Sequence, residues 1–114
     1  MSNLLLAVLL SLGIISTQDV VREMAVREDV NPRLSACIVT NESNWNPMCR
    51  GALDERGLYQ LLPSTAIWAA TKLGWDGFEL DDLDDQVKNA EMGTWILKHY
   101  PAWYSTIEKC EGVR

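Results

Sequence analysis

The sequence predicts a mainly α-helical protein with little or no β-sheet. Apolar residues recur at helical spacing in several segments, and proline or glycine stands where those segments begin or end. Alternating strand patterns are nearly absent. At 114 residues, with an ordinary apolar fraction of 47%, the chain fits one domain with a short N-terminal extension.

Four helices are expected after the extension. They should lie at about residues 18–28, 32–43, 63–74 and 85–99. Asn31 followed by Pro32 is typical of a helix N-terminus, and Gly74 stands where a C-terminal cap is expected. Residues 44–58 hold Asn, Pro, Gly and charged residues and should form a long loop. Loops of this length inside a small domain are often functional.

The first 18 residues are the most apolar part of the chain. An unbroken apolar run from Leu4 to Leu10 suits a secretory signal and is short for a bilayer span. No Lys or Arg precedes this run, and no A-x-A cleavage site follows it. We expect residues 1–18 to be a signal peptide or an anchor that associates with the membrane, the alternative being an extra N-terminal helix. Residues 19–114 should form the folded domain.

The net charge and the scarcity of metal-binding residues argue against several classes of ligand. The formal net charge of −6 argues against a nucleic-acid ligand, because Lys and Arg must neutralise phosphates. It is compatible with a neutral or amino-sugar polymer. His99 is the single histidine, no CxxC pair is present, and the stretch "ELDDLDDQ" lacks the spacing of a calcium loop. No metal or cofactor is therefore expected.

The three cysteines leave the disulfide state open. Cys37 falls within an apolar helical run and is expected to be a small core residue. Cys49 and Cys110 could form one bridge that closes a long loop if the protein is exported. Their positions in space decide the matter.

The stretch "ACIVTNESNW" places Glu42 at the end of the second expected helix. A solvated surface acid is one interpretation. Partial burial beside an apolar helix face would instead favour the protonated carboxyl that a general acid needs. Ser43 adds a hydrogen-bonding group, and Trp45 adds a flat apolar face suited to sugar rings or to the core. Glu42 is thus a candidate catalyst whose assignment depends on its surroundings.

A second polar residue in an apolar setting follows in "GLYQLLPSTA". Gly57 permits a positive φ or a close backbone approach. Gln60 lies three residues later and would need hydrogen-bond partners if buried. The hydroxyl and acetamido groups of a sugar polymer would serve.

Three segments in order resemble a known family. "NESNWNP", "GLYQLLPSTA" and "LDDQVKNAEMGTWIL" look like the motifs of the soluble lytic transglycosylase domain, in the lysozyme-like superfamily. The similarity covers about residues 18–100. It implies a lysozyme-like small α-domain, a helical bundle around a glycan cleft.

The resemblance assigns roles position by position. Glu42 matches the family's single catalytic acid/base, and Gln60 matches the glutamine that lines the sugar-binding cleft. Leu62 takes an apolar cleft position, and Tyr59 replaces the methionine before the glutamine. Gly93 matches a motif glycine, for which we expect close packing against the catalytic helix.

The activity that the resemblance implies is cleavage of the β-1,4 bond between N-acetylmuramic acid and N-acetylglucosamine, with a 1,6-anhydro product. The partner would be the glycan strands of peptidoglycan. The site of action would be the periplasm or cell envelope, or a phage virion. Cofactors are not implied.

The chain departs from the family pattern in its loop and C-terminal segment. Gly51 lies near the place of a family serine, and the A-Y-N-A-G segment is missing. Tyr100 or Tyr104 could stand in for its tyrosine. Asp54 or Glu55 could activate a water, which would give a goose-type lysozyme hydrolase. A non-catalytic peptidoglycan-binding module is the third interpretation.

Overall fold

The computed structural model describes residues 1–113, which fold into α-helices and short 3-10 helices. The α-helices are α1 (Asn3–Ser11), α2 (Thr17–Arg27), α3 (Pro32–Ser43), α4 (Pro63–Leu73) and α5 (Gln86–His99), and the 3-10 helices are η1 (Leu80–Asp84), η2 (Pro101–Trp103) and η3 (Ile107–Val113). In this part of the chain, β-structure consists of two isolated bridges that join Arg50 to Arg56 and Arg56 to Leu61. The mainly α-helical prediction is confirmed.

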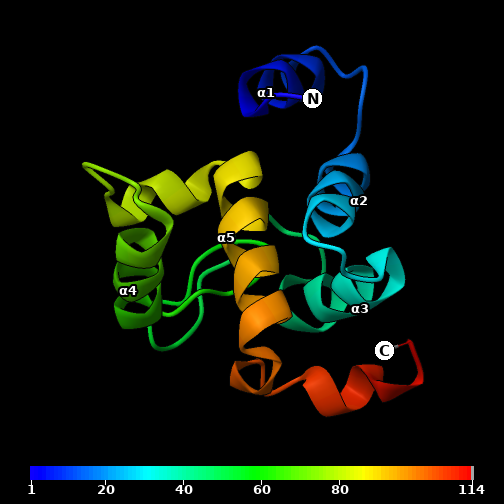
Figure 1. The fold of residues 1–114 in the computed structure, drawn as a ribbon, viewed down its shortest axis with the longest axis vertical. Helices are drawn as coiled ribbons and strands as arrows, with labels where there is room; N and C mark the ends of the chain where they lie inside the picture. Colours follow the sequence, from blue (N-terminus) through cyan, green and yellow to red (C-terminus); the bar gives the residue numbers. More distant parts are fainter. Residues whose placement is uncertain (114) are drawn as a thin grey trace.

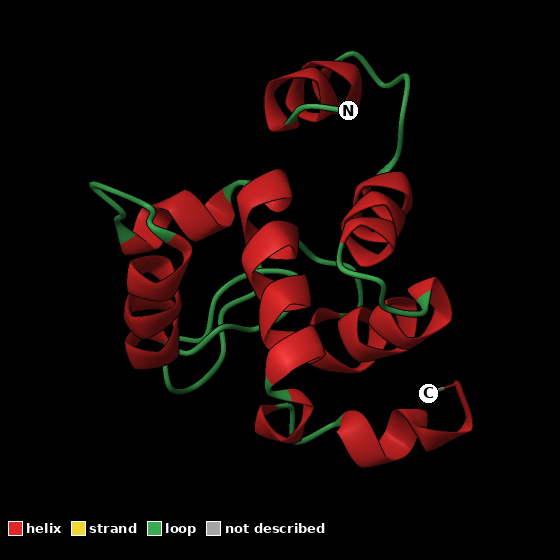
Figure 2. Cartoon of the chain, viewed as in Figure 1, coloured by secondary structure: helices red, strands yellow, loops and turns green. Residues whose placement is uncertain are grey.

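Helix α5 lies at the centre of the molecule, with α4 on one side and α2 and α3 on the other (Figure 1). The C-terminal segment turns back after α5, so that η3 lies beside α3 (Figures 1 and 2). Apolar side chains of all these elements form one core. The loop between α3 and α4 passes behind α5 (Figure 2) and carries the first part of "GLYQLLPSTA", which continues into α4.

The helix boundaries follow local signals in the sequence. The Asn31 side chain accepts a hydrogen bond from Arg33 N, with Pro32 as the first residue of α3. Gly74 ends α4 in the left-handed conformation at φ +72°. The Asp85 side chain accepts hydrogen bonds from the backbone N–H groups of Val87 and Lys88 at the start of α5. The four predicted helices agree with α2–α5 to within a residue or two.

Helix α1 packs on the domain through one face. Leu6 is 2% exposed and belongs to the core, whereas Leu4 on the opposite face is 76% exposed. Within residues 1–113, no helix combines the length and apolarity that a membrane crossing requires. The assignment of residues 1–18 as a signal or anchor stays a prediction.

The disulfide joins Cys37 to Cys110, and Cys49 is free. The suggested pairing of Cys49 with Cys110 is therefore wrong, and Cys37, expected as a small core residue, is partly buried against the core and forms the bridge instead. The physical reason is the return of η3 along α3, which brings the two Cα atoms to 5.9 Å. The bridge attaches the C-terminal segment to the helix that carries Glu42.

Candidate active site

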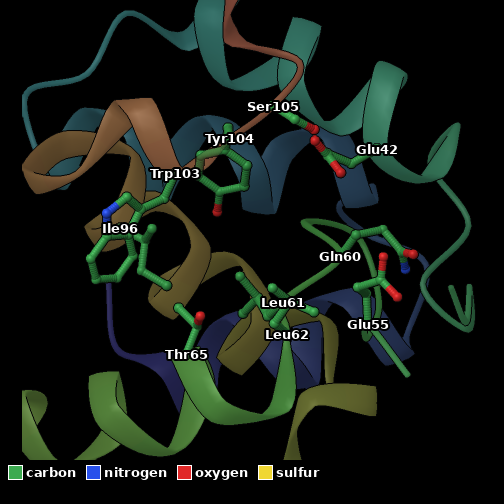
Figure 3. Close-up of a pocket in the computed structure, with 10 residues that line it drawn as sticks. All are labelled: Glu42, Glu55, Gln60, Leu61, Leu62, Thr65, Ile96, Trp103, Tyr104 and Ser105. Atoms are coloured by element: carbon green, nitrogen blue, oxygen red, sulfur yellow. The ribbon is translucent and has the colours of Figure 1, made fainter. Parts of the chain in front are cut away.

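A pocket of about 410 Å³ opens where the end of α3, the α3–α4 loop, the start of α4, α5 and the C-terminal segment meet. Its lining residues are Glu42, Glu55, Gln60, Leu61, Leu62, Thr65, Ile96, Trp103, Tyr104 and Ser105. Figure 3 shows Glu42 on one side and Trp103 with Ile96 on the other, with Leu62 and Thr65 below them. The volume is in the range of small-ligand sites.

Glu42 lies in the last turn of α3. Asn44 and Trp45 adopt positive φ angles directly after the helix, so the chain turns away and leaves the Glu42 side chain at the pocket. The residue is half-buried, and its Oε2 accepts a 2.6 Å hydrogen bond from Thr106 Oγ1. The expected catalytic acid therefore lies in a pocket and is held in one orientation by the C-terminal segment.

Tyr104 lines the same pocket and is nearly buried, at 5% exposed. Its hydroxyl donates a 2.9 Å hydrogen bond to the carbonyl of Gly93 on α5. Burial, together with the nearby Tyr59 and Glu42, raises the pKa of Tyr104 well above its ordinary value of 10.0. The phenol is thus a neutral group beside the carboxyl. Of the two tyrosines considered from the sequence, Tyr104 lies at the pocket.

Gln60 and Leu62 also line the pocket. Gln60 adopts a positive φ of 48°, and its Nε2 donates to the carbonyls of Cys49 and Gly57 at 3.0 Å each. These bonds fix the amide at the pocket wall. Leu62 is 39% exposed at the start of α4 and contributes apolar surface.

The loop carrying Gln60 is attached to α5 through Asn89. Asn89 Nδ2 donates to the carbonyls of Arg56 and Leu83, and its Oδ1 accepts from Tyr59 N at 3.0 Å. Gly57 lies against this amide, and a Cβ there would come within 2.3 Å of Asn89 Nδ2. The second and third motifs therefore meet in space. Asn89 was not among the expected site residues, although it stands in the third motif, "LDDQVKNAEMGTWIL".

Tyr59 is fully buried and does not line the pocket. Its ring packs on Gly93, where a Cβ would approach Tyr59 Cγ to 2.3 Å, and its hydroxyl is 3.1 Å from Thr94 Oγ1. The expected role of Tyr59 in substrate binding is not supported by this position. Gly93 is closely packed as expected, but its neighbour is Tyr59 rather than the helix that carries Glu42.

Comparison with known proteins shows the family of this chain. A family model described as the transglycosylase SLT domain matches residues 19–110. The chain belongs to the SLT transglycosylase domain family. A Haemophilus influenzae protein named "Putative soluble lytic murein transglycosylase" is 37% identical over 78 residues, which are 67% of this chain and 13% of that protein. No solved structure gives a significant match.

Three other expected residues of this SLT domain lie outside the pocket. Ser43 is 7% exposed and donates to the Val39 carbonyl within α3. Trp45 donates its indole N–H to Thr40 and lines a separate hollow beside α2. Tyr100, directly before η2, packs against Trp68, Trp95 and Trp103. Their direct contact with substrate is not supported by these positions.

The two loop carboxylates of the SLT domain, Asp54 and Glu55, have different surroundings. Asp54 is exposed and paired with Arg56, whose hydrogen bonds lower the Asp54 pKa. Glu55 lines the pocket, and its Oε1 accepts from Leu53 N at 2.6 Å. A Cβ on Gly51 would lie 2.5 Å from Glu55 Oε1, so the missing side chain at residue 51 leaves room for this carboxylate.

The C-terminal segment supplies the site residues that the sequence did not indicate. The chain folds back after Pro101, and this brings Trp103 and Ser105 to the pocket. It also brings Thr106 to Glu42. The aromatic run directly after the last long helix was the available signal. In residues 1–113, no group of three or more His, Cys, Asp or Glu side chains is arranged to hold a metal.

Proposed function

We propose that this SLT domain is a peptidoglycan lytic transglycosylase that uses Glu42 as its single general acid/base. The observation that carries the proposal is the half-buried Glu42 carboxyl, held by Thr106 in a 410 Å³ pocket with Gln60 and Tyr104. Family membership over residues 19–110 supports the same chemistry. The substrate is the β-1,4 bond between N-acetylmuramic acid and N-acetylglucosamine.

The reaction needs one carboxyl that acts twice. Protonated Glu42 donates its proton to the glycosidic oxygen as the bond to the muramoyl anomeric carbon breaks. The Glu42 carboxylate then takes the proton from the muramoyl C6 hydroxyl, whose oxygen bonds to the anomeric carbon. The products are a free 4-hydroxyl and a 1,6-anhydro end, and Glu42 is protonated again. No water is consumed, because the substrate supplies its own nucleophile.

The residues around Glu42 have distinct tasks in this proposal. Thr106 fixes the carboxyl, and the sugar's N-acetyl group stabilises the oxocarbenium-like transition state. Gln60 and Leu62 form the wall against which the glycan lies. Tyr104 supplies a neutral ring face beside the acid, while its hydroxyl stays bonded to the Gly93 carbonyl.

Action on peptidoglycan places the protein outside the cytoplasm, in the periplasm or envelope or in a phage virion. Residues 1–18 would then serve as the signal peptide or anchor. Fractionation of cells that express the full chain, with the mass of the N-terminus measured, tests this part. Cytoplasmic protein that retains Met1 and does not associate with membranes would contradict it.

Digestion of purified sacculi tests the main proposal. We expect the wild type to release muropeptides with anhydro ends and Glu42→Gln to release none. Glu108→Gln is the matched control, because Glu108 is an exposed acid on η3 away from the pocket. Anhydro products from a folded Glu42→Gln protein would remove Glu42 from its role.

A lysozyme-type hydrolase is the second candidate, because Glu55 lines the same pocket as Glu42. Glu55 would act as the base that activates a water, as the second carboxylate does in inverting glycosidases. Reducing ends in place of anhydro ends would favour it. Binding of sacculi without any product would instead indicate a non-catalytic module.

A further inference from the structure

An aromatic cluster lies beside the Glu42 pocket and takes no part in the chemistry proposed above. It consists of Trp68 on α4, Trp95 on α5, Tyr100 and Trp103. Trp103 is 52% exposed. A half-exposed indole held by other rings is unusual as core packing and suited to contact with a ligand.

The neighbours of Trp103 hold its ring in place. The Tyr100 ring is stacked on it at a centroid distance of 4.5 Å and an interplanar angle of 22°. The Trp68 ring contacts it at 5.2 Å and 56°. Because the indole is packed on two sides, little side-chain freedom is lost when a ligand covers its exposed surface.

A second hollow, of about 200 Å³, lies against these rings. It is lined by Ser64, Thr65, Trp68 and Trp103. Thr65 and Trp103 also line the Glu42 pocket, so the two hollows adjoin along a common wall. Figure 3 shows Trp103 and Thr65 at the end of the pocket opposite Glu42.

We propose that Trp103 and Trp68, with Ser64 and Thr65, form a saccharide-binding subsite for a sugar ring of the same glycan strand that is cut at Glu42. This rests on the proposed function. The C–H face of a pyranose packs on an indole, and the two hydroxyls can hydrogen-bond the sugar's oxygen atoms. A polymer bound at Glu42 continues past the edges of the pocket, and the adjoining hollow lies at one of these edges.

Chain-length dependence of binding tests the subsite. The probes are chitin oligosaccharides from the disaccharide to the hexasaccharide, titrated calorimetrically into the Glu42→Gln protein so that no turnover occurs. Affinity should increase once the oligosaccharide reaches from Glu42 to Trp103. Adding Trp103→Ala should remove that gain and weaken hexasaccharide binding about tenfold, while the shortest bound oligosaccharide is unaffected.

Two further variants separate stacking from general damage. Trp103→Phe keeps an aromatic face and should retain most of the gain. Trp75→Ala removes a partly buried tryptophan that lies by α4 and contacts Phe78 away from both hollows, and it should leave the length dependence unchanged. Unchanged length dependence in folded Trp103→Ala overturns the subsite, and so does an equal loss for Trp75→Ala.

Failure of the subsite proposal can be told apart from failure of the transglycosylase proposal. If sacculi yield no anhydro ends but Trp103→Ala still removes the length dependence, the transglycosylase proposal fails and the glycan subsite stands. If anhydro ends form but length dependence does not involve Trp103, the subsite alone is overturned.

Discussion

Thr106 Oγ1 donates a 2.6 Å hydrogen bond to Glu42 Oε2, across a sequence separation of 64 residues. The bond joins the last turn of α3 to the strip of chain between η2 and η3. Tyr104 lies in the same segment and Trp103 is the last residue of η2, and both line the pocket. The C-terminal segment therefore completes the site from the side opposite to the Gln60 loop.

Removal of the Thr106 hydroxyl should slow the reaction. Hydrogen bonds to charged groups contribute about 1.5–3 kcal/mol, so we expect Thr106→Val to lower kcat for anhydro-product release about tenfold or more. Thr106→Ser keeps the donor and should stay near the wild type. Full kcat in Thr106→Val, with an unchanged melting curve, would show that the bond has no role in catalysis.

Loss of the Cys37–Cys110 disulfide should destabilise the fold. The bridge spans 73 residues, for which chain entropy predicts about 4 kcal/mol of stabilisation. Urea unfolding of Cys110→Ser should show a loss of that order, and dithiothreitol should no longer affect this variant. Cys49→Ser is the control, since Cys49 is free and the variant should keep the sensitivity of the wild type. A melting temperature of the wild type that does not respond to reductant would contradict the role of the bridge.

Variants at Gly51 and Glu55 should not change the kind of product. A side chain on Gly51 would force the Glu55 carboxylate to move, since the two groups would be 2.5 Å apart. The single-carboxyl mechanism needs no second acid, so Gly51→Ser and Glu55→Gln should both still yield anhydro ends. Digestion in heavy-oxygen water checks this. Incorporation of the label by the wild type, abolished in Glu55→Gln, would support hydrolysis instead.

Gly93→Ala should be destabilising even though alanine favours helices. The added Cβ would lie 2.3 Å from Tyr59 Cγ, and overpacking of this kind costs about 1–3 kcal/mol. Gly112→Ala is the control, because a Cβ there meets nothing within 4 Å. Urea denaturation measures both. Equal stability of Gly93→Ala and the wild type would mean that the Tyr59 ring shifts without cost.

The two buried tyrosines should ionise at higher pH in the folded protein than in the unfolded chain. Burial raises the pKa of Tyr59 and Tyr104 above the ordinary value of 10.0. The contribution of these two groups to the free energy of unfolding is therefore fully present below pH 10. It decreases above pH 10, because the unfolded chain releases their protons first. Phenolate absorbance should show both side chains protonated beyond pH 10 until unfolding. Ionisation of Tyr59 and Tyr104 at pH 10 in the folded protein would contradict this.

The helices could be predicted because their signals are local. Asn31 with Pro32, and Gly74 with its left-handed cap, act within one turn of the chain. Glu42 and Gln60 were expected near one another from the family motifs, and both line one pocket. Contacts between elements far apart in the sequence could not be predicted, because no local signal specifies them.

Tyr59 and Cys110 are two residues whose positions could not be predicted from the sequence. The side-chain directions around Gln60 follow from a positive φ rather than from a strand or helix period, so the sequence did not show that Tyr59 points into the core. The pairing of Cys110 with Cys37 requires the return of η3 along α3, which no motif signals. Thr106 was missed for the same reason.

The central claim is that Glu42 alone converts peptidoglycan to anhydro-ended muropeptides. Mass spectrometry of sacculi digested in heavy-oxygen water, with the wild type and Glu42→Gln side by side, tests it most directly. We predict products lighter than reducing muropeptides by one water, with no heavy oxygen, from the wild type and none from Glu42→Gln. Labelled reducing ends from the wild type, or anhydro ends from folded Glu42→Gln, would contradict the claim.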